Sequence, residues 1–179
     1  LAGIKALGLN LPEKEISGLA RMGSGSASRS IPDGFVLWHK GKDHQSSYAA
    51  SLHPADWWKL TDIVAMVSRE KKEISSLDGH QLAKTSHYFQ KRLEQLPKRI
   101  VKIKKALKTK NLRLLGETME EEAIDLHAIA MTSKPAVFYL NGVTMELIKQ
   151  IRKWRQDGLM SYFTIDAGPN LHVICEHKA

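Results

Sequence analysis

The order of apolar patterns along the chain constrains its fold most strongly. Between about residue 81 and residue 158, apolar side chains recur at the spacing of helices that bury one face. Two short apolar stretches follow, at residues 161–165 and 171–176, and turn-forming residues separate them as in a hairpin. Three more strand-like stretches come earlier, at residues 35–39, 48–52 and 62–67. Strands followed by helices and a terminal hairpin predict an α+β layer structure.

Local signals refine this prediction. Residues 1–9 have the pattern of the end of a helix, and residues 12–22 that of a second short helix. The apolar run at residues 62–67 is short enough to be a buried strand. Residues 69–79 should form a polar loop, and Pro97 should break or restart the long helical region.

A change of character at residues 54–59 predicts a domain boundary, which divides the chain into residues 1–55 and 56–179. The chain has no initiator Met and opens inside a helical pattern. We therefore expect it to be a piece of a longer protein.

Composition narrows the class of protein but selects no function. The apolar fraction of 42% is typical of a globular protein, and no stretch approaches the roughly 18 apolar residues of a membrane helix. The single cysteine, Cys175, cannot form an internal disulfide, so we expect a cytoplasmic location. The net charge of +8 owes much to residues 98–110, which indicate a solvated helix face or, alternatively, a surface for a polyanion.

The most suggestive segment for chemistry is residues 23–30, with the sequence GSGSASRS. Its glycines let the backbone approach a ligand closely, and Ser24 and Ser26 offer hydroxyl groups. Arg29 adds a planar cation that can hold a carboxylate or phosphate with two hydrogen bonds. The segment matches neither a dinucleotide-binding fingerprint nor a Walker loop, so from its residues alone it is an anion site or a plain loop.

A second candidate is Asp166, at the end of an apolar strand and the start of the turn DAGPN. Its carboxylate should be partly desolvated there and could accept a proton from a substrate hydroxyl. The alternative is an ordinary tight turn. His127 is a weaker candidate base, and the histidines as a set show no metal-ligand spacing.

Taken together, these segments resemble the mevalonate diphosphate decarboxylase family of the GHMP kinase superfamily. The matching motifs occur in the family order and cover essentially the whole chain: ARMGSGSASRS at 20–30, KKEISS at 71–76, Thr85-Ser86, LHA at 126–128, and IDAGPN at 165–170. Ser28, His80 and Ile165 depart from the usual Cys, Met and Phe. The resemblance implies a GHMP kinase-like two-domain fold, with residues 1–55 ending the N-terminal domain and 56–179 forming the C-terminal one.

The resemblance also implies a reaction. The family uses ATP and Mg²⁺ to phosphorylate the tertiary hydroxyl of mevalonate 5-diphosphate and then releases CO₂ to give isopentenyl diphosphate. It implies that Ser24 and Ser26 donate to the substrate diphosphate, that Arg29 pairs with the substrate carboxylate, and that Asp166 orients or deprotonates the hydroxyl. It assigns further pocket-lining roles to Ser75, Ser76, Thr85 and Ser86. The expected partner is thus a small molecule and not nucleic acid or a membrane. A homodimer is also compatible with the resemblance.

The family's phosphate-binding loop would precede Leu1, so ATP contacts are not assigned and the chain alone should be inactive. A phosphomevalonate decarboxylase or a mevalonate kinase are alternatives within the superfamily. Arg29 and Asp166 together favour a decarboxylase, because a pure kinase has less need to hold a carboxylate. A basic RNA-binding module that uses residues 98–110 is a distant alternative, and it lacks the aromatic strand motif that stacks bases. The enzymatic prediction requires Arg29 and Asp166 to share one cleft.

Overall fold

The computed structural model describes residues 2–69 and 74–176. The chain divides into two compact units, Leu1–Trp58 (unit 1) and Lys59–Ala179 (unit 2), and each is described by itself. In the sequence, the division falls near the boundary predicted between residues 55 and 56. That this boundary separates two family domains remains a proposal. None of the described helices is long and apolar enough to cross a membrane.

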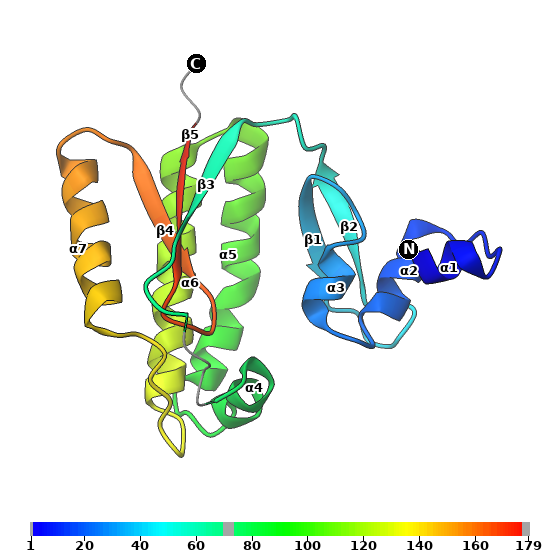
Figure 1. Cartoon of the computed structure of the whole chain (residues 1–179), viewed down its shortest axis with the longest axis horizontal. Coiled ribbons are helices and arrows are strands. Elements are labelled where there is room, and N and C mark those ends of the chain that lie inside the picture. Colours follow the sequence, from blue (N-terminus) through cyan, green and yellow to red (C-terminus); the bar gives the residue numbers. More distant parts are fainter. Residues whose placement is uncertain (1, 70–73, 177–179) are drawn as a thin grey trace. The chain divides into compact units, whose positions relative to one another are not determined.

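Unit 1 combines short helices with a two-stranded hairpin (Figure 1). Helices α2 and α3 pack on the hairpin, whose antiparallel strands place Trp38 opposite Ala49. Pro12 immediately precedes α2, and Glu13 and Glu15 lie in its first turn, where carboxylates favour a helix. The elements are α1 (Ala2–Ala6), α2 (Glu13–Ala20), α3 (Gly25–Arg29), β1 (Phe35–His39) and β2 (Tyr48–His53).

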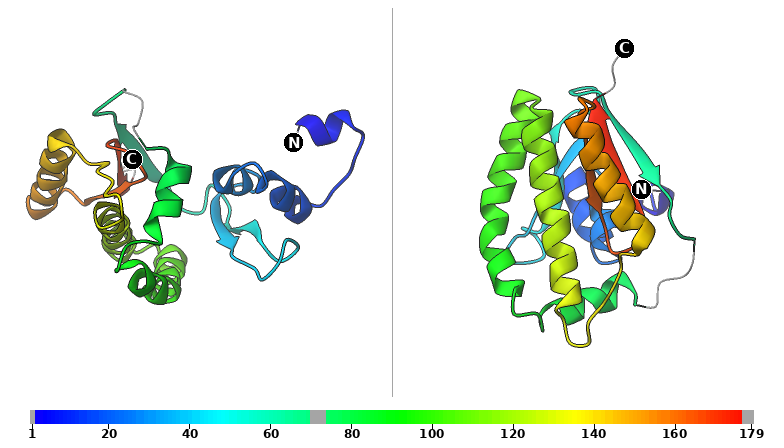
Figure 2. Two further views of the ribbon diagram at one scale, coloured as in Figure 1. Left: turned by 90° about the horizontal axis from the view of Figure 1, so that it is seen from below. Right: turned by 90° about the vertical axis from the view of Figure 1, so that its left-hand side faces the viewer.

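Unit 2 is an antiparallel sheet in the order β3-β5-β4, packed against helices (Figures 1 and 2). Helices α5 and α6 lie side by side, and α6 and α7 both contact β4. The elements are β3 (Leu60–Ala65), α4 (Ser76–Ala83), α5 (Phe89–Thr109), α6 (Leu112–Met131), α7 (Gly142–Gln156), β4 (Ser161–Ile165) and β5 (Leu171–Glu176). The core consists of Ala123, Ile151, Phe163, Ile165, Leu171 and Val173. The predicted α+β class is confirmed.

Three local predictions are wrong. The strand at residues 62–67 is not buried: Ile63 and Val64 are 54% and 56% exposed, because β3 is an edge strand. Pro97 lies inside a continuous α5; it is exposed, so water can hydrate the carbonyl that loses its partner. The polar loop ends early because Ser75 accepts a hydrogen bond from the Asp78 N–H at 3.1 Å and starts α4 at Ser76.

The basic residues of α5 divide between two environments. Arg99 forms ion pairs with Glu122 and Asp125 of α6, and Arg92 also pairs with Glu122. The remaining charge lies on solvated side chains: Lys98, Lys104, Lys105 and Lys108 are exposed. The cluster therefore belongs to the helix–helix contact and to a solvated face.

Candidate functional site

Residues 24–29, for which the sequence indicated an anion site or a plain loop, form a short helix with its N-cap. Ser24 is the N-cap of α3: its Oγ accepts a hydrogen bond from the Ala27 N–H at 3.0 Å and lies 3.2 Å from Ser26 Oγ. Ser24, Ser26 and Arg29 are all exposed. These groups thus stand together on one helical turn with their polar atoms open to a ligand.

Buried serines fix this helical turn to the rest of unit 1. Ser17 of α2 donates from Oγ to the Ser28 carbonyl at 3.0 Å, and its Oγ lies 2.9 Å from Ser28 Oγ. The same Ser17 Oγ accepts from the Ala49 N–H of β2 at 2.8 Å. Both serines are fully buried. The sequence did not predict this role of Ser17, because its only signal was a serine beside Ile16 on the apolar side of a helix.

A close glycine–tryptophan contact packs α3 against β1. A Cβ at Gly25 would lie 2.6 Å from the Trp38 ring, so only glycine lets the helix approach β1 this closely. The Arg29 guanidinium carbon lies 6.0 Å from the centroid of the same ring. Trp38 therefore supports both the backbone and the cation of the predicted anion site.

Asp166 begins the turn between β4 and β5, as predicted, but its surroundings differ from the expectation. It is exposed within the described structure, so the expected partial desolvation of its carboxylate is absent. Its carbonyl accepts a hydrogen bond from the Gly168 N–H at 2.8 Å, which closes the turn. Arg29 belongs to unit 1 and Asp166 to unit 2, so their meeting in one cleft stays a prediction.

The further pocket-lining candidates in unit 2 have hydrogen bonds of their own. Ser75 caps α4, and its Oγ donates to Asp78 Oδ2 at 2.6 Å. Thr85 Oγ1 donates to the Leu82 carbonyl and accepts from the Lys134 N–H, both at 2.7 Å. Ser76 is exposed in the first turn of α4.

Ser86 Oγ is 2.7 Å from Thr132 Oγ1, in a contact that joins the segment before α5 to the C-cap residue of α6. These bonds give Ser75, Thr85 and Ser86 structural roles, and substrate contact stays a prediction. The motif residues Lys71, Lys72 and Glu73 lie outside the described residues.

His127 is buried in unit 2 at 2% exposure, with its ring edge-on to Tyr139 at a centroid distance of 6.1 Å. Its Nε2 is buried and has no hydrogen-bond partner among the described residues. Burial lowers the pKa of His127 below its ordinary value, and the Asp166 main chain and charge raise it by less. The imidazole is therefore neutral near pH 7. It interacts with the main chain of Asp166, at the start of the β4–β5 turn.

This lowered pKa predicts a loss of stability in mild acid. The unfolded histidine binds a proton near pH 6.5, whereas the folded one resists until a lower pH. The free energy of unfolding should thus fall as pH drops through about 6.5 and level off below the folded pKa. Urea unfolding of wild type and His127→Gln between about pH 7.5 and about pH 5 measures this pH dependence. The free energy of unfolding of the variant should fall less steeply with decreasing pH, because the variant lacks the titrating imidazole. Equal slopes would contradict the assignment.

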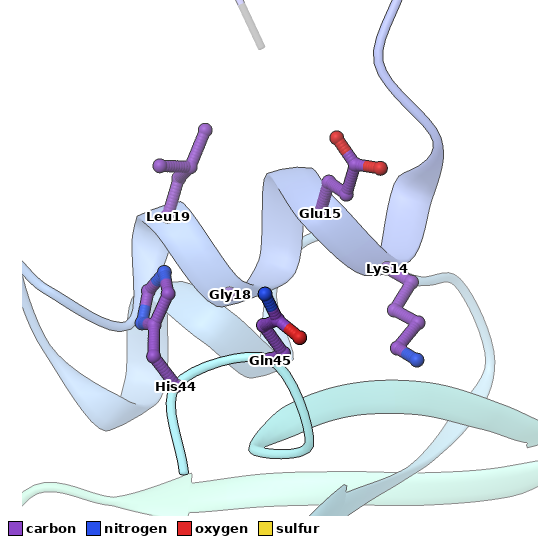
Figure 3. A pocket seen from close by; sticks show the side chains of 6 residues that line it. All are labelled: Lys14, Glu15, Gly18, Leu19, His44 and Gln45. Atoms are coloured by element: carbon purple, nitrogen blue, oxygen red, sulfur yellow. The ribbon is translucent and has the colours of Figure 1, made fainter.

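A cavity of about 390 Å³ lies in unit 1 between α2 and the loop that joins the strands (Figure 3). Arg21 holds this loop, donating from Nε to the Ser47 carbonyl at 3.2 Å and lying 2.7 Å (Nη2) from His44 Nδ1. The cavity contains none of the predicted site residues; its lining is Lys14, Glu15, Gly18, Leu19, His44 and Gln45.

Within residues 2–69 and 74–176, no three His, Cys, Asp or Glu side chains gather as a metal site. The Mg²⁺ expected from the resemblance therefore has no preformed cluster of three such side chains among the described residues. Asp166 alone of the predicted site residues carries a carboxylate.

Two known protein families match separate parts of this chain. Residues 62–179 match the family described as "Mevalonate 5-diphosphate decarboxylase C-terminal domain". Residues 1–49 match the "Diphosphomevalonate decarboxylase-like N-terminal domain". The diphosphomevalonate decarboxylase of Candida albicans is 37% identical over 161 residues, which cover 87% of this chain and 44% of that protein. The Saccharomyces cerevisiae protein is 34% identical over 92% of this chain and 44% of its own length. The chain thus spans less than half the length of these relatives.

Solved structures share the fold. A structure described as "MDDEF in complex with MVAPP, AMPPCP and Magnesium" matches with a TM-score of 0.91 and 36% identity over 96% of this chain and 53% of that one. The mevalonate diphosphate decarboxylase of Staphylococcus aureus matches with a TM-score of 0.88 and 35% identity over 93% and 51%. The expected GHMP kinase-like fold is therefore confirmed. By sequence and by structure, this chain belongs to the mevalonate diphosphate decarboxylase family.

Proposed function

We propose that the protein containing this chain converts mevalonate 5-diphosphate to isopentenyl diphosphate, with ATP as phosphoryl donor and Mg²⁺ as metal. The observation that carries this proposal is the family match, which covers residues 62–179 and is joined by the N-terminal match at residues 1–49. The similar structure described with MVAPP, AMPPCP and magnesium supports the choice of substrate, nucleotide and metal. The single cysteine supports a cytoplasmic location.

The residues of the two units suit different parts of this chemistry. The hydroxyls of Ser24 and Ser26 are exposed on one turn and can donate to a diphosphate, and Arg29 beside them can hold a carboxylate with two parallel hydrogen bonds. Asp166 stands on a braced turn and can accept the proton of the tertiary hydroxyl as that oxygen attacks the γ-phosphoryl group.

Loss of the new phosphate leaves a developing cation. The electron pair of the breaking C–C bond then forms the alkene as CO₂ departs. In this scheme Arg29 keeps the substrate carboxylate in position until the phosphate has left.

Asp166→Asn tests the proton-accepting role in the complete gene product. We expect kcat for isopentenyl diphosphate formation to fall by about 100-fold, because the amide cannot take the hydroxyl proton. Asp157→Asn is the matched control, since Asp157 is an exposed acid in the same unit, at the end of α7. Turnover near that of wild type in Asp166→Asn would contradict the role.

Arg29→Ala tests the carboxylate clamp in the same protein. We expect kcat/KM for mevalonate 5-diphosphate to fall by about 100-fold through loss of a charge-assisted, two-pronged contact. Arg152→Ala, at an exposed arginine of α7, is the control. Parallel assays with mevalonate 5-phosphate and with mevalonate separate the diphosphate decarboxylase from the alternatives, and a preference for either would overturn the proposed substrate.

A further inference from the structure

The turn at residues 166–170 is tied to a segment far away in the sequence. Asn170 Oδ1 accepts hydrogen bonds from the Val67 N–H at 2.9 Å and the Ser68 N–H at 3.1 Å. Strand β3 ends at Ala65, so these two amides lie just beyond the sheet ladder. One side-chain oxygen thus joins the β4–β5 turn to the chain that leaves β3.

A second contact holds the turn from the side of α7. Thr144 Oγ1 donates to the Pro169 carbonyl at 2.7 Å, and Thr144 is fully buried. Thr144 is itself fixed by Asn141, whose Oδ1 accepts from the Thr144 N–H at 2.9 Å. The turn is therefore braced by α7 on one side and by residues 67 and 68 on the other.

These contacts explain how an exposed aspartate can keep a defined position. The Asp166 side chain is open to solvent, so its own packing does not determine where the carboxylate lies. The turn backbone must determine it, and two residues at the end of the turn tie that backbone to other segments, Asn170 through its side chain and Pro169 through its carbonyl. At the start of the turn, the His127 ring interacts with the Asp166 main chain. A displacement of about 1 Å in a catalytic group can cost about 100-fold in rate, so such bracing has a direct consequence for turnover.

We propose that Asn170 is a positioning residue: by holding the amides of residues 67 and 68, it keeps the Asp166 carboxylate in place for the reaction. This inference rests on the proposed function. It assigns to Asn170 no contact with substrate. Its effect passes through the turn backbone.

The test compares Asn170→Ala with Asn170→Asp in the complete gene product. Alanine removes the acceptor, so kcat should fall by about 10-fold to about 100-fold while KM for ATP stays within about 2-fold. Aspartate keeps an oxygen that can accept both N–H groups and should recover most of the lost kcat. Hydrogen exchange of the Val67 and Ser68 amides should be faster in the alanine variant and close to wild type in the aspartate variant.

Asn111→Ala is the matched control for stability. Asn111 Oδ1 accepts from the Leu114 N–H at 2.9 Å as the N-cap of α6, so this variant also loses an asparagine acceptor, but outside the turn. It should lower the melting temperature comparably without changing kcat. Wild-type kcat in Asn170→Ala, or an aspartate variant as slow as the alanine one, would overturn the positioning role alone. A wild-type protein without decarboxylase activity would overturn the proposed function and this inference together.

Discussion

Replacing Gly116 with alanine should destabilise unit 2 by about 3 kcal/mol. A Cβ at this position would lie 1.9 Å from Tyr162 Cγ and 2.3 Å from both Cδ atoms, well inside contact distance. The ring cannot easily yield, because Tyr162 is 1% exposed and the Arg155 guanidinium lies 4.3 Å from its centroid. The helix propensity that alanine gains over glycine is only about 1 kcal/mol, so the steric cost prevails.

Denaturant unfolding of the chain measures this effect, with Gly142→Ala as the control. Gly142 also lies in a helix of unit 2, but a Cβ there would meet nothing within 4 Å. We expect the control to stay within about 0.5 kcal/mol of wild type. If Gly116→Ala unfolded at the same denaturant concentration as the control, α6 would not pack on Tyr162 as described.

Glu120→Gln should also cost about 3 kcal/mol, because it breaks a buried ion pair and leaves the partner charge uncompensated. Glu120 accepts hydrogen bonds from Arg155 at 2.8 and 3.0 Å and from the Phe163 N–H at 3.2 Å. Arg155 also donates to the Ser161 carbonyl at 2.8 Å. One carboxylate thereby joins α6, α7 and β4, and its hydrogen bonds raise the pKa of Arg155, so the pair stays charged.

A neighbouring ion pair on α7 supplies the contrast. Lys149 and Glu146 are 69% and 72% exposed, whereas the side chains of Arg155 and Glu120 are 22% and 8% exposed. Solvent screens the first pair, so Glu146→Gln should change the free energy of unfolding by no more than about 0.5 kcal/mol. Denaturant unfolding measures both changes. Equal effects of the two Glu→Gln changes would contradict the role of Glu120 in joining α6, α7 and β4.

Patterns with a short period were predictable from the sequence. The strands at residues 35–39, 161–165 and 171–176 have the predicted bounds, because turn residues flank each apolar run. The errors concern features that depend on distant partners. Whether β3 is buried depends on its place at the sheet edge, and whether Pro97 breaks α5 depends on whether that part of the helix faces water.

The candidate site divides in the same way. Arg29 and Asp166 could be predicted as site residues from motifs that the family shares, since each lies in a short, ordered pattern. The residues that hold those motifs in place were not found, because Ser17, Thr144 and Asn170 act through partners elsewhere in the sequence. A single sequence carries no signal for such pairings.

The position of β5 in the middle of its sheet has a consequence for synthesis on the ribosome. β5 pairs with β3 on one side and β4 on the other, yet it is the last of the three to be translated. Strand β3 therefore has no partner strand, and its backbone hydrogen-bonding groups stay unpaired, while α4 to α7 are synthesised. Nascent chains that stop before residue 171 should lack the sheet altogether, and helices α5 and α6, which are neighbours in sequence, are the part of unit 2 able to associate first.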